Sequence, residues 1–490
     1  MASLPTQDST ASFWHSEPSH FLLGHRTTPD IPTEADIVIV GSGITGASAA
    51  RFLAEDARAK RLRVVMLDAR EACWCATGRN GGHCQPLLFD STPDVAAFEL
   101  RNYNAVKSYI KKHNVPCEWR SLTGCRTFWT EPLAKAAADD VRDLKRHAPE
   151  LGKEVTVIDD EESLRRHRVN GAPGATLSAC AGSLWPYKLI AFILEDLIKE
   201  GHLNLQTKTP VTKIEPCADD PEGPAPTGPR HILHTPRGTI KARHVILATN
   251  AYTSHLLPEF ADLIVPERGV MTALLPPAKS KPLEDSYGFV GALGGNPIHD
   301  DYLNQRPFSG VPNPAGHLMF GGGYVGKKLN MIGETDDSVL DEGSASYLRA
   351  ALLKLLILGG DTGGLKELKT THQWSGIWGT SKDHHPWVGA VPSRPGVWLA
   401  GGYSGHGMPN GTLCGKAVVE MLLAQEAGVA LDDVQNRLVT DGDLPQAYII
   451  TQDRIERCKH IDSVQVQDRK GIVGIRSLDA MIQAQRNTKL

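Results

Sequence analysis

A glycine-rich turn between two short apolar segments is the feature that most constrains the fold of this chain. Residues 36–40 (Asp-Ile-Val-Ile-Val) and residues 63–68 (Arg-Val-Val-Met-Leu-Asp) each have the composition of a buried parallel strand. Residues 47–54 between them are rich in alanine and favour a helix. A strand, a helix and a strand in this order form a right-handed βαβ unit, so we expect an α/β domain with a parallel sheet.

The turn itself has the spacing of a dinucleotide-binding loop. Gly-Ser-Gly-Ile-Thr-Gly follows the first strand directly, and Asp68 ends the second strand 22 residues after Gly46. Gly43 lets a pyrophosphate approach the backbone, and the start of the helix offers free N–H groups to it. Asp68 would accept hydrogen bonds from ribose hydroxyls, although a structural turn beside a solvated acid has the same letters. The motif assigns these residues to the dinucleotide: Gly41, Ser42, Gly43, Ile44, Thr45, Gly46, Asp68, Ala69 and Arg70.

The rest of the chain indicates that this domain is assembled from separate pieces. Residues 244–248 and 396–400 repeat the pattern of an apolar strand that ends at small residues, whereas residues 130–147 favour an amphipathic helix and residues 289–320 aromatic-containing strands. We therefore predict a discontinuous Rossmann-type domain with an inserted α+β substrate domain that contains a mixed or antiparallel sheet. The predicted boundaries are 34–110, 165–268 and 370–430 for the first domain, 111–164 and 269–369 for the second, 1–33 for an N-terminal extension and 431–490 for a C-terminal tail.

Bulk composition narrows the class of protein. The 490 residues suit two or three domains, and 41% hydrophobic with 22% charged residues is ordinary for a globular protein. The net charge of −4 and the mixed signs give no basic stripe for nucleic acid, and no apolar run reaches the roughly 18 residues of a membrane span. Nine scattered cysteines favour a reducing compartment. Only Cys73 and Cys75 lie close together in the sequence, and no second cysteine pair has the spacing of a zinc site, so we expect no metal site. A cytoplasmic location is expected, with peroxisomal targeting by the terminal Thr-Lys-Leu as the lesser alternative.

Two further motifs stand out, one at residues 76–83 and one formed by residues 383–389 together with residues 402–407. Residues 76–83 (Ala-Thr-Gly-Arg-Asn-Gly-Gly-His) contain three glycines that let the chain run close beneath a ring, and Arg79 could donate to phosphate or ring oxygens. An ordinary glycine-rich loop with a surface arginine would have the same sequence. Residues 383–389 have the form Asp-x-x-Pro-x-x-Gly, and residues 402–407 read Gly-Tyr-Ser-Gly-His-Gly.

The three motifs together resemble the D-amino-acid-oxidase-like superfamily of FAD-dependent oxidoreductases, in particular its γ-glutamylputrescine-oxidase-like and glycine-oxidase-like branch. The resemblance extends over roughly residues 34–423 and keeps the family's order. It implies FAD as the cofactor, with the last turn placing backbone amides at the pyrimidine edge of the flavin, where reduction develops negative charge. The residues that it assigns to FAD are Thr77, Gly78, Arg79, Asn80, Gly81, Gly82, His83, Val211, Ala248, Thr249, Asn250, Gly376, Gly402, Tyr403, Ser404, Gly405, His406, Gly407 and Met408.

The sequence departs from the family pattern at two positions that bear on chemistry. Ser375 and Ile377 stand where some relatives attach flavin to a cysteine, so non-covalent FAD is expected. Cysteines and His83 around the second loop leave another attachment point open. Met408 follows the Gly-His-Gly turn where sarcosine-oxidase-like members have lysine, so that basic group is missing here.

The resemblance implies oxidation of a primary or secondary amine or an amino acid. Hydride passes from the α-carbon to flavin N5, the imine hydrolyses, and oxygen or another acceptor takes the electrons; such chemistry needs little acid–base machinery. The candidates for catalytic residues are Arg268, Trp374, His384 and His406. Each has a structural alternative: a surface arginine paired with Glu267, a core tryptophan, a solvated histidine and a turn residue.

Two other functions remain open at this point. An FAD-dependent dehydrogenase or monooxygenase acting on a non-amine substrate with NAD(P)H would be expected to carry a second Gly-x-Gly-x-x-Gly motif after a strand, and the sequence contains none. A flavin-binding protein without turnover would not need the retained motif residues around Arg79 and His406.

Overall fold

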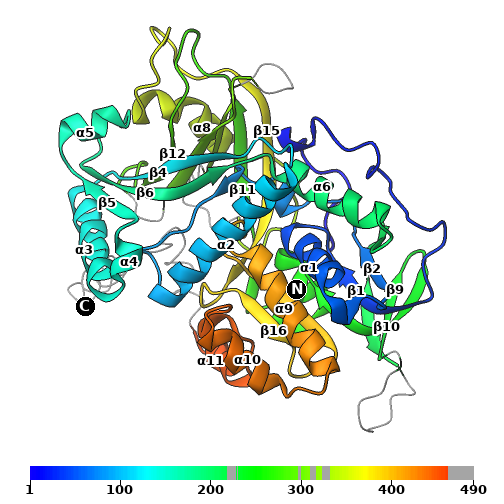
Figure 1. The fold of residues 1–490 in the computed structure, drawn as a ribbon. Coiled ribbons are helices and arrows are strands. Elements are labelled where there is room, and N and C mark those ends of the chain that lie inside the picture. Colours follow the sequence, from blue (N-terminus) through cyan, green and yellow to red (C-terminus); the bar gives the residue numbers. More distant parts are fainter. Residues whose placement is uncertain (218–227, 229, 296–298, 310–315, 323–330, 462–490) are drawn as a thin grey trace.

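The computed structural model describes residues 1–217, 228, 230–295, 299–309, 316–322 and 331–461 (Figure 1). The proline-rich sequence at 221–229, apart from Gly228, and the terminal Thr-Lys-Leu lie outside the described residues. Two sheets lie side by side, each with helices against it. The predicted class is confirmed: a Rossmann-type sheet joined to a domain with a mixed sheet.

The first sheet contains the glycine-rich motif. Its strand order is β16 (Trp387–Ala390), β17 (Val397–Gly401), β10 (Gly238–Leu247), β1 (Glu34–Val40), β2 (Val64–Leu67) and β7 (Asn204–Gln206), with β8 (Lys213–Pro216) and β9 (His231–Thr235) beside β10. The strands from β17 to β7 run parallel. Ile37 and Val38 on β1 are fully buried and pack into different core clusters, because both faces of the sheet are covered.

Close packing of α1 (Ile44–Glu55) determines where the glycine-rich turn points. Gly41 has φ of 103°, a conformation that favours glycine. A Cβ on Gly46 would lie 1.9 Å from the Gly41 carbonyl oxygen, so only glycine lets α1 approach β1 this closely. On its other side α1 packs against α9 (Gly411–Glu426), where a Cβ on Gly415 would lie 2.8 Å from the Thr45 carbonyl oxygen.

The second sheet belongs to the inserted domain. Its strand order is β15 (Thr370–Ser381), β11 (Ile264–Leu274), β14 (Leu318–Gly322), β13 (Asp300–Gln305), β12 (Asp285–Val290), β4 (Arg120–Phe128), β6 (Gly174–Ser183) and β3 (His83–Cys84), with β5 (Val155–Ile158) on β6. The pairs are antiparallel except β4 with β12, which makes the sheet mixed. Leu348 and Leu352 of α8 (Glu342–Leu355) pack against Leu274 and Phe320 of the sheet.

Sheet membership differs from the boundaries expected at 165 and 370. Both β6 and β15 fall within ranges assigned to the first domain, yet they pair with strands of the second sheet. An apolar strand pattern says that a segment is a strand, but the pairing partner is chosen by tertiary contacts. The second sheet therefore contains two strands, β6 and β15, that the predicted boundaries placed in the first domain.

The remaining elements connect the two sheets or cover their ends. α2 contacts α9 of the first domain and β6 of the second. These elements are α2 (Pro93–His113), α3 (Glu131–His147), α4 (Pro149–Gly152), α5 (Glu161–Arg166), α6 (Pro186–Lys199), α7 (Thr253–Leu256), α10 (Leu431–Thr440), α11 (Gln452–Lys459), η1 (Phe13–His15), η2 (Ala57–Ala59), η3 (Ala76–Gly78), η4 (Asn250–Tyr252), η5 (Pro258–Phe260) and η6 (Gln446–Tyr448). No helix in the described ranges has the length and apolar character needed to cross a bilayer.

Candidate active site

One cavity of about 440 Å³ connects the glycine-rich turn with the face of the second sheet. Gly43 and Asp68 line it at the first sheet, and Met271, Asp300 and Tyr302 line it at the second. The cavity therefore has a nucleotide side and a side formed by the inserted domain. Its lining includes residues from all three sequence motifs.

Asp68 organises the nucleotide side. Its carboxylate accepts hydrogen bonds from the Ser42 backbone N–H and the Arg70 backbone N–H, both at 2.9 Å, and from the Ser42 hydroxyl. Burial raises the pKa of this carboxyl group, and the hydrogen bonds from Ser42 and Arg70 oppose that rise. Asp68 thus holds the turn in shape and also faces the cavity, as a residue that binds a ribose would.

The three motifs meet at the N-terminus of α1. The Ile44 N–H donates to the Thr77 hydroxyl at 3.0 Å, which brings in the second motif. The Thr45 and Tyr403 hydroxyls lie 2.8 Å apart, which brings in the third. A helix N-terminus carries unsatisfied N–H groups and partial positive charge, so this meeting point is a place for an anion such as a pyrophosphate.

The second motif runs along the cavity with its backbone held from two sides. The Gly81 N–H donates to the Tyr302 hydroxyl at 2.9 Å, and the Trp14 indole N–H donates to the Asn80 carbonyl oxygen. A Cβ on Gly81 would lie 2.3 Å from the Tyr302 ring, so the sheet and the loop are in close contact. This loop is thereby fixed between the second domain and the N-terminal extension.

The Arg79 guanidinium lines the cavity and is held by the surrounding protein. Its Nε donates to the Ser375 carbonyl oxygen at 2.7 Å, and its terminal nitrogens donate to Ser9 and Thr10. Asp337 lies 3.3 Å from Nε. All three nitrogens are engaged by the protein, so the side chain fixes the loop in place at the cavity.

The Ser-Gly-His turn forms the edge of the cavity before α9. Ser404 and Gly405 have φ of 50° and 89°, so the backbone is left-handed there. The Ser404 N–H donates to the Gly379 carbonyl oxygen at 2.8 Å. His406 lies with Nδ1 3.6 Å from a carboxylate oxygen of Glu99, which comes from α2. The turn is thus tied to β15 on one side and to α2 on the other.

The second domain lines the cavity with aromatic side chains, and the titratable groups of His83 and Tyr302 each stay in one protonation state. His83 is in hydrogen-bond contact with the Ser286 hydroxyl at 3.0 Å, and burial lowers its pKa to about 3. Burial raises the pKa of Tyr302 to about 12. Trp378 and Met271 line the same region. His83 is therefore neutral and Tyr302 protonated across the physiological pH range.

Two carboxylates, those of Asp300 and Glu267, line the cavity where the second sheet borders it. Asp300 lies 2.9 Å from the Arg126 guanidinium, and Asp90 lies 3.8 Å from Arg126. Neither carboxylate oxygen of Asp90 has a hydrogen-bond partner among the described residues, and burial raises the pKa of this group well above its usual value. Glu267 also lines the cavity and accepts a hydrogen bond from Thr380 at 2.8 Å.

Two of the four candidate catalytic residues line the cavity and two do not. His384 and His406 are in the lining. Arg268 instead donates to the Asp336 carbonyl oxygen at 2.9 Å, because alternation along β11 turns its neighbours Glu267 and Gly269 to the cavity. Trp374 is fully buried and donates to the Arg79 carbonyl oxygen at 2.7 Å, so it is a core residue.

Most of the residues assigned to FAD lie in the cavity lining. Val211 is among them and lies just before β8. The exceptions support neighbouring residues by packing or by hydrogen bonds: Gly46, Arg70, Gly78, Gly82 and Gly402.

No sequence motif predicted the support that comes from the C-terminal segment. Arg454 of α11 donates to both carboxylate oxygens of Asp383, at 2.8 and 2.9 Å, and its guanidinium stacks on Trp387 at 3.8 Å. The Tyr448 hydroxyl donates to Asn410 at 2.9 Å, just before α9. The polar tail therefore braces the turn that carries His384. A lone arginine in a short polar helix gives no signal from which this contact could have been predicted.

Comparisons with known proteins agree with this geometry. A family model described as "DAO: FAD dependent oxidoreductase" matches residues 36–421. A probable oxidoreductase OrdL of Rhizobium meliloti (strain 1021) is 26% identical over 422 residues, which are 81% of this chain and 85% of that protein. Gamma-glutamylputrescine oxidoreductase of Escherichia coli (strain K12) is 23% identical, over 79% of this chain and 83% of that protein.

Solved structures share the fold. Glycine oxidase from Geobacillus kaustophilus superposes with a TM-score of 0.62 at 21% identity, over 80% of this chain and 95% of that chain. L-amino acid deaminase from Proteus vulgaris also gives 0.62, at 16% identity, over 85% of this chain and 95% of that chain. At these identities the likeness establishes the fold alone.

We expect Asp68→Ala to weaken FAD binding about ten- to hundredfold. The protein would lose a charge-assisted hydrogen bond to the ribose, worth roughly 1.5–3 kcal/mol. Flavin occupancy after gel filtration and a fluorescence titration measure the effect. Asp30→Ala, which changes an exposed aspartate in the N-terminal extension, is the control. Equal FAD affinity for both variants and the parent protein would remove Asp68 from the site.

We expect Arg454→Ala to lower the free energy of unfolding by about 3–5 kcal/mol, because it removes the charge partner of the partly buried Asp383 carboxylate. Burial raises the pKa of Asp383, but the Arg454 guanidinium outweighs this effect and holds the pKa at about 2. The stabilisation from this ion pair is therefore fully present above the usual aspartate pKa and is lost as pH falls through about 2. Urea denaturation at neutral pH measures the loss. Arg457→Ala, an exposed position on the same helix, should change stability by less than about 0.5 kcal/mol, and identical midpoints for the two variants would argue against the bracing role.

Proposed function

This chain belongs to the DAO family of FAD-dependent oxidoreductases, and we propose that it oxidises a primary or secondary amine, or an amino acid, by hydride transfer from the α-carbon to flavin N5. The imine formed then hydrolyses in water. The observation that carries the proposal is the convergence of three separate motifs at the α1 N-terminus, beside a cavity that the second domain lines with carboxylates and aromatic side chains.

The residues present fit FAD. The N-terminus of α1 offers N–H groups to a pyrophosphate. Gly43 has no side chain to block this approach, and there is little room for one, because a Cβ at this position would lie 3.0 Å from the Thr77 hydroxyl. Asp68 would hold the ribose, and the turn at Gly405 would meet the pyrimidine edge. FAD supplies the electron acceptor, whereas the protein binds it, orients the substrate and excludes water.

The cavity suits a cationic substrate. Asp300 and Glu267 line it, and the positive charge of Arg126 is already balanced by its ion pair with Asp300. Because the charge of Asp300 is used in balancing Arg126, an ammonium ion would be drawn to the Glu267 carboxylate, and its alkyl part would lie against Trp378 and Met271. These side chains position the amine; none of them has to form a bond to it.

Non-covalent attachment of FAD is part of the proposal. Ser375 occupies the position where some relatives carry the attaching cysteine, and its hydroxyl donates to the Val339 carbonyl oxygen at 2.6 Å. Burial raises the pKa of Cys73 well above its usual value and that of Cys75 to about 12. Both thiols are therefore protonated at neutral pH and are weak nucleophiles.

An amine should bleach the flavin under anaerobic conditions, and the rate should rise with pH. Hydride leaves the α-carbon only when the nitrogen lone pair is free, so the reactive fraction grows as the bound ammonium loses its proton. His83 and Tyr302 do not change charge between their pKa values of about 3 and about 12, so neither reverses this rise. Stopped-flow absorbance with a panel of amines measures the rate.

The matched control substrate is the trimethylammonium derivative of the best amine, which has no lone pair and should leave the flavin oxidised. A flavin that ignores every primary and secondary amine, yet bleaches with an alcohol or with NADPH, would contradict amine oxidation. That result would favour a dehydrogenase or monooxygenase.

Acid precipitation of the FAD-loaded protein should leave the flavin in the supernatant. Unfolding releases a cofactor that is held only by hydrogen bonds and packing, whereas a covalent bond survives. Absorbance of the two fractions measures the partition. A yellow pellet after washing would contradict non-covalent attachment and would direct attention to His83 and the neighbouring cysteines.

A further inference from the structure

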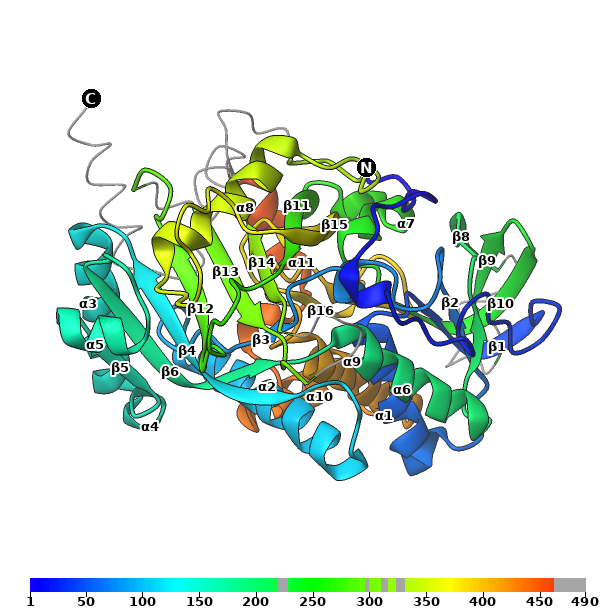
Figure 2. The same ribbon diagram turned by 90° about the horizontal axis from the view of Figure 1, so that it is seen from above.

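The N-terminal segment lies over the nucleotide side of the cavity. Leu4 and Pro5 are part of the cavity lining, together with Asp68 and the glycine-rich turn. Leu4 is partly exposed and Pro5 is buried, so this stretch separates the cavity from solvent. In Figure 2 the dark blue N-terminal trace starts near α7 and crosses the domain toward η1. The segment precedes the first residue matched by the family model, Asp36.

Both ends of this stretch are anchored. The Ala2 N–H donates to the Ser254 hydroxyl of α7 at 2.8 Å. At the other end the Phe13 and Trp14 side chains are each 1% exposed, and Trp14 holds the loop at Asn80. Between these anchors the chain has little secondary structure of its own, so its position depends on side-chain contacts.

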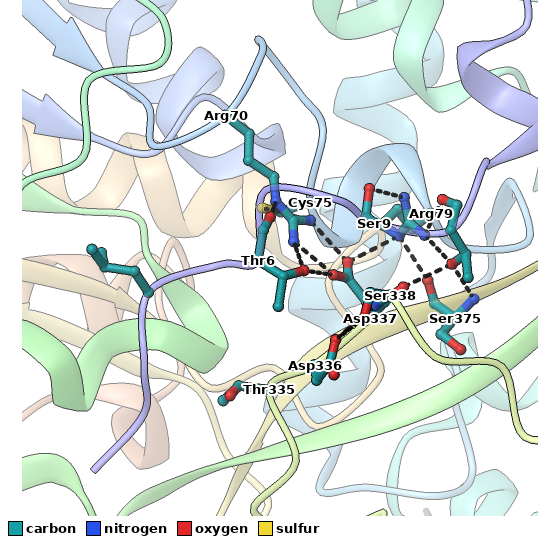
Figure 3. A network of polar contacts seen from close by, with 12 residues as sticks. Thr6, Ser9, Arg70, Cys75, Arg79, Thr335, Asp336, Asp337, Ser338 and Ser375 are labelled. Atoms are coloured by element: carbon teal, nitrogen blue, oxygen red, sulfur yellow. Dashed lines mark hydrogen bonds and ion pairs between the residues drawn. The ribbon is translucent and has the colours of Figure 1, made fainter.

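Asp337 supplies the central contact (Figure 3). It comes from the loop before α8 and accepts hydrogen bonds from the Arg70 guanidinium at 2.6 and 2.8 Å. The Thr6 hydroxyl donates to the same carboxylate at 2.7 Å, and the Thr10 N–H donates to the Asp337 carbonyl oxygen at 2.9 Å. Arg79 lies 3.3 Å away. One residue of the second domain thus holds the N-terminal segment and both arginines of the cofactor domain.

The charge balance makes this contact difficult to open. The side chains of Arg70, Arg79 and Asp337 are 2%, 0% and 1% exposed. Burial raises the pKa of Asp337, but the two guanidinium groups outweigh that effect and hold the pKa below its usual value, so the carboxylate is charged at neutral pH. Removing the single anion would leave two buried cations facing each other, which is strongly unfavourable.

We propose that residues 2–12 form a strap that retains FAD, and that Asp337 fastens it by binding Thr6, Arg70 and Arg79. The dinucleotide enters and leaves past Leu4 and Pro5, so the strap must lift before FAD is released. Arg79 and Arg70 act as positioning residues for the strap. The inference depends on FAD binding only and stands whether or not an amine is the substrate.

Linkage gives the strap a second measurable property. If a closed strap slows FAD release by stabilising the bound state, then bound FAD must stabilise the closed strap by the same free energy. FAD should therefore protect the backbone amides of residues 2–12 from hydrogen exchange.

The first test measures FAD release from the full-length holoprotein, followed as recovery of free-flavin fluorescence after dilution. Asp337→Asn keeps the side-chain shape and removes the charge, and release should become at least about tenfold faster. Asp336→Asn is the matched control, because that carboxylate bonds to Ser338 and lies outside the strap contacts; its release rate should stay within about twofold of the parent. A parent-like rate for Asp337→Asn overturns the proposal.

The second test needs no variant and decides the question if Asp337→Asn fails to fold. Hydrogen exchange of the parent protein is compared with and without FAD, using α5, on the far side of the second domain, as the reference peptide. Exchange in residues 2–12 should slow by about tenfold or more on FAD binding, with α5 unchanged. Equal exchange of residues 2–12 in the two states overturns the strap.

Discussion

Gly46 brings the first turn of α1 into contact with β1, and the position of the site follows from that contact. With a backbone carbonyl 1.9 Å from where a Cβ would be, any larger residue would push α1 away from the sheet. Packing of α1 against Gly415 of α9 fixes the helix from the opposite side. The N-terminus of α1 is thereby held at the point where Thr77 and Tyr403, far apart in sequence, reach it. The assembly of the cavity therefore depends on this close contact between α1 and the turn after β1.

Buried arginine and aspartate pairs join the pieces around that point. Arg454 with Asp383 fastens the C-terminal helices to the turn after β15. Asp337 with Arg70 connects the second domain to the cofactor domain. Such pairs contribute little net stability over apolar packing, yet breaking one leaves a buried charge unpaired. They therefore favour one relative placement of segments that are distant in the chain.

The third buried pair, Arg126 with Asp300, differs because it faces the cavity. There the charge of the arginine is compensated, and Glu267 adds a further carboxylate to the lining. Aromatic groups around it are held in one protonation state by burial. A site of this kind orients a substrate toward a cofactor that carries out the electron transfer. This agrees with the sequence motifs, which contain no catalytic nucleophile with a general base beside it.

The sequence by itself determined the βαβ unit, the glycine-rich turn, the position of Asp68 and the three motifs that identify an FAD site. Each of these depends on spacing within a short stretch, where backbone geometry leaves few choices. Only the tertiary structure decided where side chains with several possible partners point. Arg79 turns to Asp337, Arg268 turns away from the cavity and Trp374 is in the core. It also decided that β6 and β15 join the second sheet, and that the N-terminal and C-terminal segments close around the site. The physical reason is that strand pairing and buried charge pairing are chosen by contacts between residues far apart in the chain, and no local pattern encodes the partner.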